Sequence, residues 1–188
     1  MTTHFWVPTE PANNRLSRRQ ALAWGAAAAF GPSVAQAQPA SAAAEEAKAP
    51  PLPALGSRLA VPDLALLDGG AWRQQLGKPL LVYWWASTCP FCALQSPSMD
   101  RLWSQVRAQG WQMLALSVDR KAEDAAAYLK AKRYSFPAAW ASPAWRSGFP
   151  KPKGLPITLL AGADGRLKVA EKGQMFEEDV MALPDALL

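Results

Sequence analysis

The two cysteines of this 188-residue chain are Cys89 and Cys92, separated only by Pro90 and Phe91. They follow an apolar run that ends at Trp85, and they precede a stretch with helical periodicity. A Cys-x-x-Cys pair that opens a helix after a strand suits thiol–disulfide exchange, because the free N–H groups and the positive dipole of a helix N-terminus stabilise a thiolate. Cys92, one turn further on, can attack a mixed disulfide formed at Cys89. We therefore predict that Cys89 is the catalytic nucleophile and Cys92 the resolving thiol.

Other uses of this dithiol fit the sequence less well. A structural zinc site usually needs four Cys or His ligands, but the one histidine, His4, lies in a segment that we expect to be removed. A structural disulfide normally closes a longer loop. A copper(I) site on the two sulfurs stays open as an alternative of another class, although the chain has no Met-rich stretch. The motif itself implies no organic cofactor and no metal.

The first 37 residues have the features of an export signal. Ser17-Arg18-Arg19-Gln20-Ala21-Leu22 resembles the twin-arginine pattern, with Ala21 where Phe is more usual. An Ala-rich apolar stretch follows, too short to span a membrane, and Ala35-Gln36-Ala37 matches an A-x-A cleavage site. We expect a cleaved signal peptide, a mature start at Gln38 and a periplasmic location, where disulfides persist.

Charge and composition delimit the rest of the chain. The chain has a net charge of +5, and its basic residues do not cluster, so we expect no nucleic-acid partner. Residues 38–55 are rich in Ala, Pro and Glu, which predicts a disordered linker. The globular domain is predicted over residues 56–188.

The domain alternates strand and helix patterns. Apolar runs and turn signals predict strands at 80–86, 111–118, 138–140, 155–160 and 167–171. Helical periodicity predicts helices at 89–109, 121–132 and 176–188, with a short helix or loop at 142–148. The predicted inward stripe of the first helix is Leu94, Met99, Leu102, Trp103 and Val106. This order predicts an α/β fold with helices on both faces of a sheet.

Together these patterns resemble the thioredoxin superfamily, and within it the periplasmic TlpA/ResA/DsbE-like branch, over residues 56–188. The resemblance rests on Trp85-Ala86-Ser87-Thr88-Cys89-Pro90-Phe91-Cys92, on the helix-kinking Pro97, on Gly154-Leu155-Pro156-Ile157-Thr158-Leu159 and on Ala163-Asp164-Gly165-Arg166-Leu167. The stretch between Asp119 and Gly148 fits the helix and strand that this branch inserts. The implied fold is thioredoxin-like, with three layers around a central mixed β-sheet.

The resemblance implies a periplasmic thiol–disulfide oxidoreductase that exchanges disulfides with protein substrates through Cys89 and Cys92. It favours the reductive direction, as in cytochrome c maturation or a related thiol-reducing pathway, with a membrane electron donor of DsbD/CcdA type. We expect a monomer. A disulfide-forming oxidase is the alternative in the same class. A peroxidase fits less well, because the Pro-x-x-x-Thr-x-x-Cys context of peroxiredoxins is missing.

The resemblance also implies substrate-binding residues. Pro156 is expected to be cis and to lie against the dithiol, so that the backbone of Leu155 can pair with an extended substrate peptide. Most tryptophans are expected in the core. Trp85, with Trp72 or Trp145, is the candidate for an apolar rim that binds the partner.

Several positions near the dithiol depart from the family pattern. Thr88 stands where Trp is frequent, Gln95 where relatives have an acidic residue that helps proton transfer, and Tyr83 where thioredoxin proper has a buried acidic residue. Gln95 can hydrogen-bond but cannot accept a proton at neutral pH. Phe91 offers a thiolate neither a hydrogen bond nor a positive charge. We therefore expect a less lowered pKa for Cys89, and a less oxidising couple, than with His at position 91.

Overall fold

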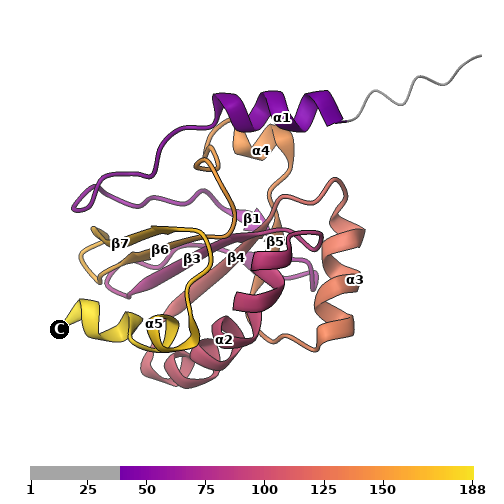
Figure 1. Cartoon of the computed structure of the whole chain (residues 1–188). Helices are drawn as coiled ribbons and strands as arrows, with labels where there is room; N and C mark the ends of the chain where they lie inside the picture. The colour runs from indigo at the N-terminus through magenta and orange to yellow at the C-terminus, as the bar shows by residue number, and fades with distance from the viewer. Residues whose placement is uncertain (1–38) are drawn as a thin grey trace, which may run out of the picture. The chain divides into compact units, whose positions relative to one another are not determined.

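The computed structural model describes residues 39–188, so the predicted export signal at 1–37 lies outside the described residues. All of the described residues lie in one compact unit. Its centre is a five-stranded sheet (Figure 1), whose strands in spatial order are β5 (Ala138–Trp140), β4 (Gln112–Ser117), β3 (Leu80–Trp85), β6 (Ile157–Ala161) and β7 (Leu167–Lys172). Strands β5, β4 and β3 are parallel, whereas β6 is antiparallel to both β3 and β7. The prediction of a mixed sheet is confirmed.

Strands β3 and β4 form the middle of the sheet. Every residue of both strands is buried, as expected for strands that are covered on both faces. Because successive side chains of a strand point to opposite faces, Tyr83 belongs to one apolar cluster and Trp84 to the other. The chain therefore has two core layers, one on each side of β3.

Helices cover both faces of the sheet (Figure 1). One face packs against α2 (Pro90–Val106), α3 (Ala122–Lys132), α5 (Glu177–Met181) and the short 3-10 helix η2 (Leu183–Leu187). The other face is covered by the region of α4 (Pro143–Arg146) and by the segment that contains the hairpin of β1 (Leu64–Ala65) and β2 (Ala71–Trp72). The three-layer thioredoxin-like arrangement is confirmed.

Helix α2 has clear start and stop signals. Cys89 is its N-cap and Pro90 its first residue, a position where proline loses no needed N–H. The helix continues through Pro97 and is followed by the 3-10 turn η1 (Arg107–Gln109). Gly110 then ends the helical segment in the left-handed region, with φ of 83°.

The prediction that Leu94 on α2 is a core residue is wrong. Leu94 is 63% exposed. Cys92, Gln95, Met99, Leu102 and Val106 follow one another at intervals of three or four residues and define the buried face of α2, and Leu94 lies off that face. The buried set is Cys92, Gln95, Ser96, Ser98, Met99, Leu102 and Val106.

The region predicted as a disordered linker, 38–55, contains the helix α1 (Pro39–Lys48). Its Ala-rich sequence favours a helix, and the chain after it pairs with the domain. The backbone N–H of Lys153 donates to the carbonyl of Pro50 (2.8 Å). The prediction of disorder is therefore wrong for α1. Within residues 39–188, no helix combines the length and apolar character needed to cross a membrane.

The predicted helix at 176–188 is also shorter than expected. It consists of α5 followed by η2, which has Pro184 in its first turn. A proline cannot donate the backbone hydrogen bond that would continue an α-helix, and this explains the break.

Candidate active site

The two cysteines lie between the end of β3 and the first turn of α2. Cys89 has extended backbone angles as the N-cap, and its Sγ accepts a hydrogen bond from the backbone N–H of Cys92 (3.2 Å). The two residues form a disulfide, with their Cα atoms 5.2 Å apart. Cys89 is half-buried, whereas Cys92 is 1% exposed. This difference supports the predicted roles, because a partner can reach only the sulfur of Cys89.

A buried phenol lies beneath the dithiol. Tyr83 Oη donates to the carbonyl oxygen of Cys92 (3.2 Å) and lies 3.1 Å from Ser96 Oγ. Burial raises the pKa of Tyr83 well above its ordinary value, and the hydrogen bond with Ser96 offsets only part of this effect. Tyr83 is therefore neutral at physiological pH. It anchors the first turn of α2 without offering a carboxylate to the dithiol.

Gln95 ties the helix of the dithiol to two other elements. Its side chain is 1% exposed. Its Nε2 donates to Thr158 Oγ1 on β6 (2.9 Å), and its Oε1 accepts from the backbone N–H of Met175 (2.8 Å). Positions 83 and 95, where the resemblance implies acidic residues, thus hold neutral side chains with hydrogen-bond partners.

The peptide bond between Leu155 and Pro156 is cis, as the resemblance implies. Trp84 pairs with Ile157 across the antiparallel strands β3 and β6. Continuing this register brings Leu155 and Pro156 to the end of the sheet where the chain leaves β3 toward Cys89. The structure therefore brings these two predicted substrate-binding residues to the dithiol end of the sheet.

The predicted rim residue Trp85 is not on the surface. It is 0% exposed, and its ring packs 5.5 Å from that of Tyr128 on α3. Trp72 and Trp145 belong to the opposite face of the sheet. The prediction of a tryptophan rim is wrong, because alternation along β3 turns Trp85 into the layer beneath α2 and α3.

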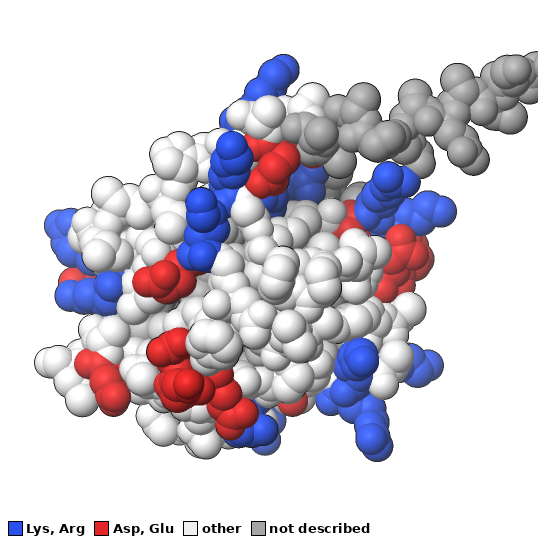
Figure 2. Space-filling view, in the orientation of Figure 1, with Lys and Arg blue, Asp and Glu red and all other residues white. Residues whose placement is uncertain are grey.

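Two other apolar residues are exposed beside the dithiol. Phe91 and Leu94, both on the first turns of α2, are 56% and 63% exposed. The central part of the molecular face in Figure 2 carries few charged side chains, whereas acidic side chains gather below it. Because their side chains are exposed at the start of α2, Phe91 and Leu94 replace the tryptophans as the candidate apolar contact surface.

Asp119 is a site residue that sequence analysis missed. Its carboxylate accepts hydrogen bonds from the backbone N–H of Ser87 (3.0 Å), from Ser87 Oγ (2.7 Å) and from Ser117 Oγ (2.7 Å). Asp119 is 8% exposed. It therefore fixes the loop two residues before Cys89. The available signal was an acidic residue directly after a buried strand, but its partner Ser87 lies 32 positions away.

We predict that Asp119→Ala lowers the free energy of unfolding of the oxidised protein by about 2 kcal/mol, because it leaves the N–H of Ser87 and the hydroxyl of Ser117 without their acceptor. Denaturant titration measures this loss. The control is Asp124→Ala, at an exposed position of α3. Equal stability of the two variants would contradict the role of Asp119.

We also predict that Gln95→Glu adds a titration step to the pH dependence of disulfide exchange. A carboxyl group at this buried position has its pKa raised by desolvation, so its ionisation adds to that of the thiol. The rate of exchange with a model disulfide, measured from acid to alkaline pH, checks this. Gln95→Met is the neutral control. A second step already present in the wild-type profile would show that the site is not neutral.

Comparison with known proteins agrees with this geometry. The model of the AhpC/TSA family matches residues 60–185, whereas no curated protein sequence matches the chain. A thiol:disulfide interchange protein of the thioredoxin family from Chlorobium tepidum TLS is 19% identical, with a TM-score of 0.64, and the match covers 72% of this chain and 99% of that one. A secreted Mycobacterium tuberculosis disulfide oxidoreductase homologous to E. coli DsbE is 18% identical, with a TM-score of 0.58 over 66% and 95% of the two chains.

A third structure, provisionally named thiol:disulfide interchange protein DsbE, also from Chlorobium tepidum, is 25% identical, with a TM-score of 0.58 over 71% of this chain and 96% of that one. These structures share the thioredoxin fold, and in this chain that fold places the Cys-x-x-Cys pair at the start of α2. The chain therefore belongs to the AhpC/TSA family and is a thiol:disulfide oxidoreductase whose redox pair is Cys89 and Cys92.

Proposed function

We propose that this protein is a periplasmic reductase of disulfides in other proteins. The observation that carries the proposal is the limited stabilisation of the sulfur of Cys89. Within residues 39–188, the hydrogen-bond donor to this sulfur is the backbone N–H of Cys92. The side chain of the neighbouring Phe91 has neither a polar group nor a charge. A thiolate that is stabilised less makes the reduced dithiol a better electron donor.

The reductive reaction uses both sulfurs in turn. The thiolate of Cys89 attacks one sulfur of the substrate disulfide, and the first substrate thiolate leaves as a mixed disulfide forms. The thiolate of Cys92 then attacks Cys89 Sγ, the bond from Cys89 to the substrate breaks, and the second substrate thiolate leaves. Two electrons pass to the substrate, and the Cys89–Cys92 disulfide remains. Since Cys92 is buried, it can reach Cys89 but not a second partner.

Proton transfer must proceed without a side-chain carboxylate at position 95. Gln95 accepts from Met175 and donates to Thr158, and Tyr83 stays protonated. We infer that the proton of Cys92 passes to water or to the departing substrate thiolate. This route fits the neutral environment beneath the dithiol.

The oxidised protein then needs a source of electrons. We propose a membrane donor of DsbD/CcdA type, and substrates that include cysteine-bearing segments such as apocytochromes in cytochrome c maturation or a related pathway. Support comes from the export features of residues 1–37, from the resemblance to the TlpA/ResA/DsbE-like branch, and from the exposed apolar side chains of Phe91 and Leu94.

We predict a reduction potential near that of thioredoxin, about −270 mV. Equilibration with thiol buffers, followed by acid quenching and alkylation, measures the reduced fraction. Phe91→His should raise the potential toward oxidising values, because an imidazolium at this position stabilises the Cys89 thiolate. Leu94→His, at another exposed position of α2, is the matched control.

A potential near about −120 mV, the value of a strong oxidant, would support the oxidase alternative and reject the reductase. Tight stoichiometric copper(I) binding, without disulfide reductase activity, would support the alternative of a metal-handling protein.

We predict that the exported protein begins at Gln38. Signal peptidase cleavage after Ala35-Gln36-Ala37 gives this end, and N-terminal sequencing of protein from the periplasmic fraction detects it. Replacing both Arg18 and Arg19 with Lys should block export by the twin-arginine route. Periplasmic protein that retains Met1 would contradict the prediction.

A further inference from the structure

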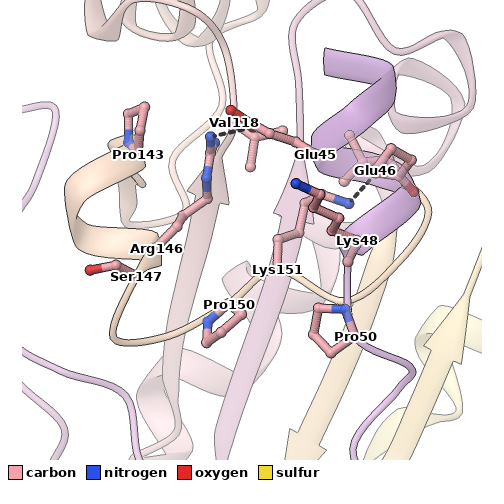
Figure 3. A pocket seen from close by; sticks show the side chains of 12 residues that line it. Glu45, Glu46, Lys48, Pro50, Val118, Pro143, Arg146, Ser147, Pro150 and Lys151 are labelled. Atoms are coloured by element: carbon pink, nitrogen blue, oxygen red, sulfur yellow. Dashed lines mark hydrogen bonds and ion pairs between the residues drawn. The ribbon is translucent and has the colours of Figure 1, made fainter. Parts of the chain in front are cut away.

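Helix α1 packs against the segment that leads to cis-Pro156. Figure 3 shows a pocket between α1, α4 and this segment, with Glu45 facing Arg146 and Glu46 facing Lys151. The pocket has a volume of about 430 Å³. Val118 and Leu155 contribute apolar side chains to its wall.

The pocket adjoins the start of the active-site loop. The backbone N–H of Val118 donates to the carbonyl of Trp85 (3.0 Å), the last residue of β3. On the other side of β3, Trp84 pairs with Ile157, so Leu155 lies next to the residues that follow Trp85. The two apolar wall residues therefore flank the point where the chain turns toward Cys89.

Lys151 is fixed in this pocket by the backbone. Its side chain is 13% exposed, and its Nζ donates to the carbonyls of Pro152 (2.7 Å) and Gly154 (2.9 Å). An ammonium group has three donors, and the third bonds to Glu46 Oε2 (3.0 Å). The two carbonyls hold the ammonium in place whichever carboxylate accepts the third bond.

Gly154 supplies the second hydrogen-bond donor to the carboxylate of Glu46. Its backbone N–H bonds to the other carboxylate oxygen, Glu46 Oε1. Gly154 has a φ of +101°, and a Cβ at this position would lie 2.9 Å from Cγ and Cδ of Lys172. Only glycine fits this backbone conformation without displacing Lys172. Lys151 and Gly154 together thus bind both oxygens of one carboxylate.

The current occupant, Glu46, is held by two hydrogen bonds, one of them part of an ion pair with Lys151. None of residues 44–50 is buried. Besides the bonds of Glu46, the segment has the ion pair of Glu45 with Arg146 (3.1 Å) and the backbone bond of Pro50 with Lys153. The carboxylate partner of each ion pair is open to solvent, with side-chain exposures of 66% for Glu45 and 39% for Glu46, and a ten-residue helix is marginal without tertiary contacts. Another carboxylate can therefore displace Glu46.

Glu46 is bound as a charged carboxylate. Burial raises its pKa, but the hydrogen bonds from Lys151 and Gly154 and the charges of Lys151 and Lys153 outweigh burial and leave the pKa below its ordinary value. This lowered pKa means that the site favours the ionised form of a carboxylic acid. The contact is complete above the ordinary pKa of glutamate and is lost as the pH falls through the lowered value.

We propose that Lys151 and Gly154 form a carboxylate-binding site beside the dithiol, occupied by Glu46 in the free protein and by an acidic side chain of the protein substrate during exchange. The proposal rests on the proposed function and adds a preference for acidic residues near the reactive cysteine. A peptide that pairs with the backbone of Leu155 as an added strand runs along this segment. Its side chains can then reach Lys151.

The test compares two peptide disulfides that differ only in having Glu or Gln on both sides of the cysteines. The full-length wild type should reduce the Glu peptide with a kcat/KM about fivefold higher than the Gln peptide, the size expected for a charge-assisted contact that is partly open to solvent. Lys151→Met should abolish this preference. Glu46→Gln should increase kcat/KM for the Glu peptide by a similar factor, whereas Glu45→Gln, which leaves Glu46 bound to Lys151 and Gly154, should have a smaller effect.

Two further measurements separate the possible failures. Reduction of the uncharged hydroxyethyl disulfide reports on the dithiol alone, and its absence would reject the proposed function. Hydrogen–deuterium exchange at the Gly154 N–H reports on the site alone and should be faster in Glu46→Gln than in Glu45→Gln. The carboxylate site is rejected if the wild type treats both peptides equally, if the preference survives Lys151→Met, or if exchange at Gly154 is the same in both variants.

Discussion

The active site depends on the burial of β3 on both faces. Apolar layers on either side hold this strand at the centre of the sheet, so its end is a fixed point from which the chain enters α2. Tyr83 on β3 bonds to the carbonyl of Cys92 and thereby joins the strand to the first turn of the helix. The N-cap position of Cys89, its partial exposure and the hydrogen bond from Cys92 all follow from this junction.

The surroundings of the dithiol are rigid, and the two side chains beneath it, Tyr83 and Gln95, carry no charge. Asp119 fixes the loop before Cys89, and Gln95 joins α2 to β6 and to the segment before α5. The carboxylate of Asp119 accepts hydrogen bonds from three groups, the N–H and hydroxyl of Ser87 and the hydroxyl of Ser117, and its role is therefore structural. A site of this kind fixes the positions of the two sulfurs. It leaves proton transfer to water or to the substrate thiolate.

The outer side of the site has exposed apolar side chains and a bound carboxylate, whereas its base consists of buried, hydrogen-bonded side chains. Phe91 and Leu94 expose apolar surface at the start of α2, and Lys151 with Gly154 binds a carboxylate on the side of the cis-proline. Polar contacts hold α1 on that side, whereas apolar burial holds the sheet. The two kinds of contact differ in how easily they exchange, because apolar layers must open to water whereas an ion pair can change partners.

The sequence by itself determined the features that arise from local order. The Cys-x-x-Cys pair at a helix start, the alternation of strands and helices, and the turn at Gly110 all depend on neighbouring residues, whose spacing is visible in the chain. The resemblance added the cis bond at Pro156. Only the tertiary structure decided that Trp85 is buried, that Leu94 is exposed and that α1 docks through Glu46. Each of these depends on partners far away in sequence, and neither composition nor periodicity records which distant surface a side chain will meet.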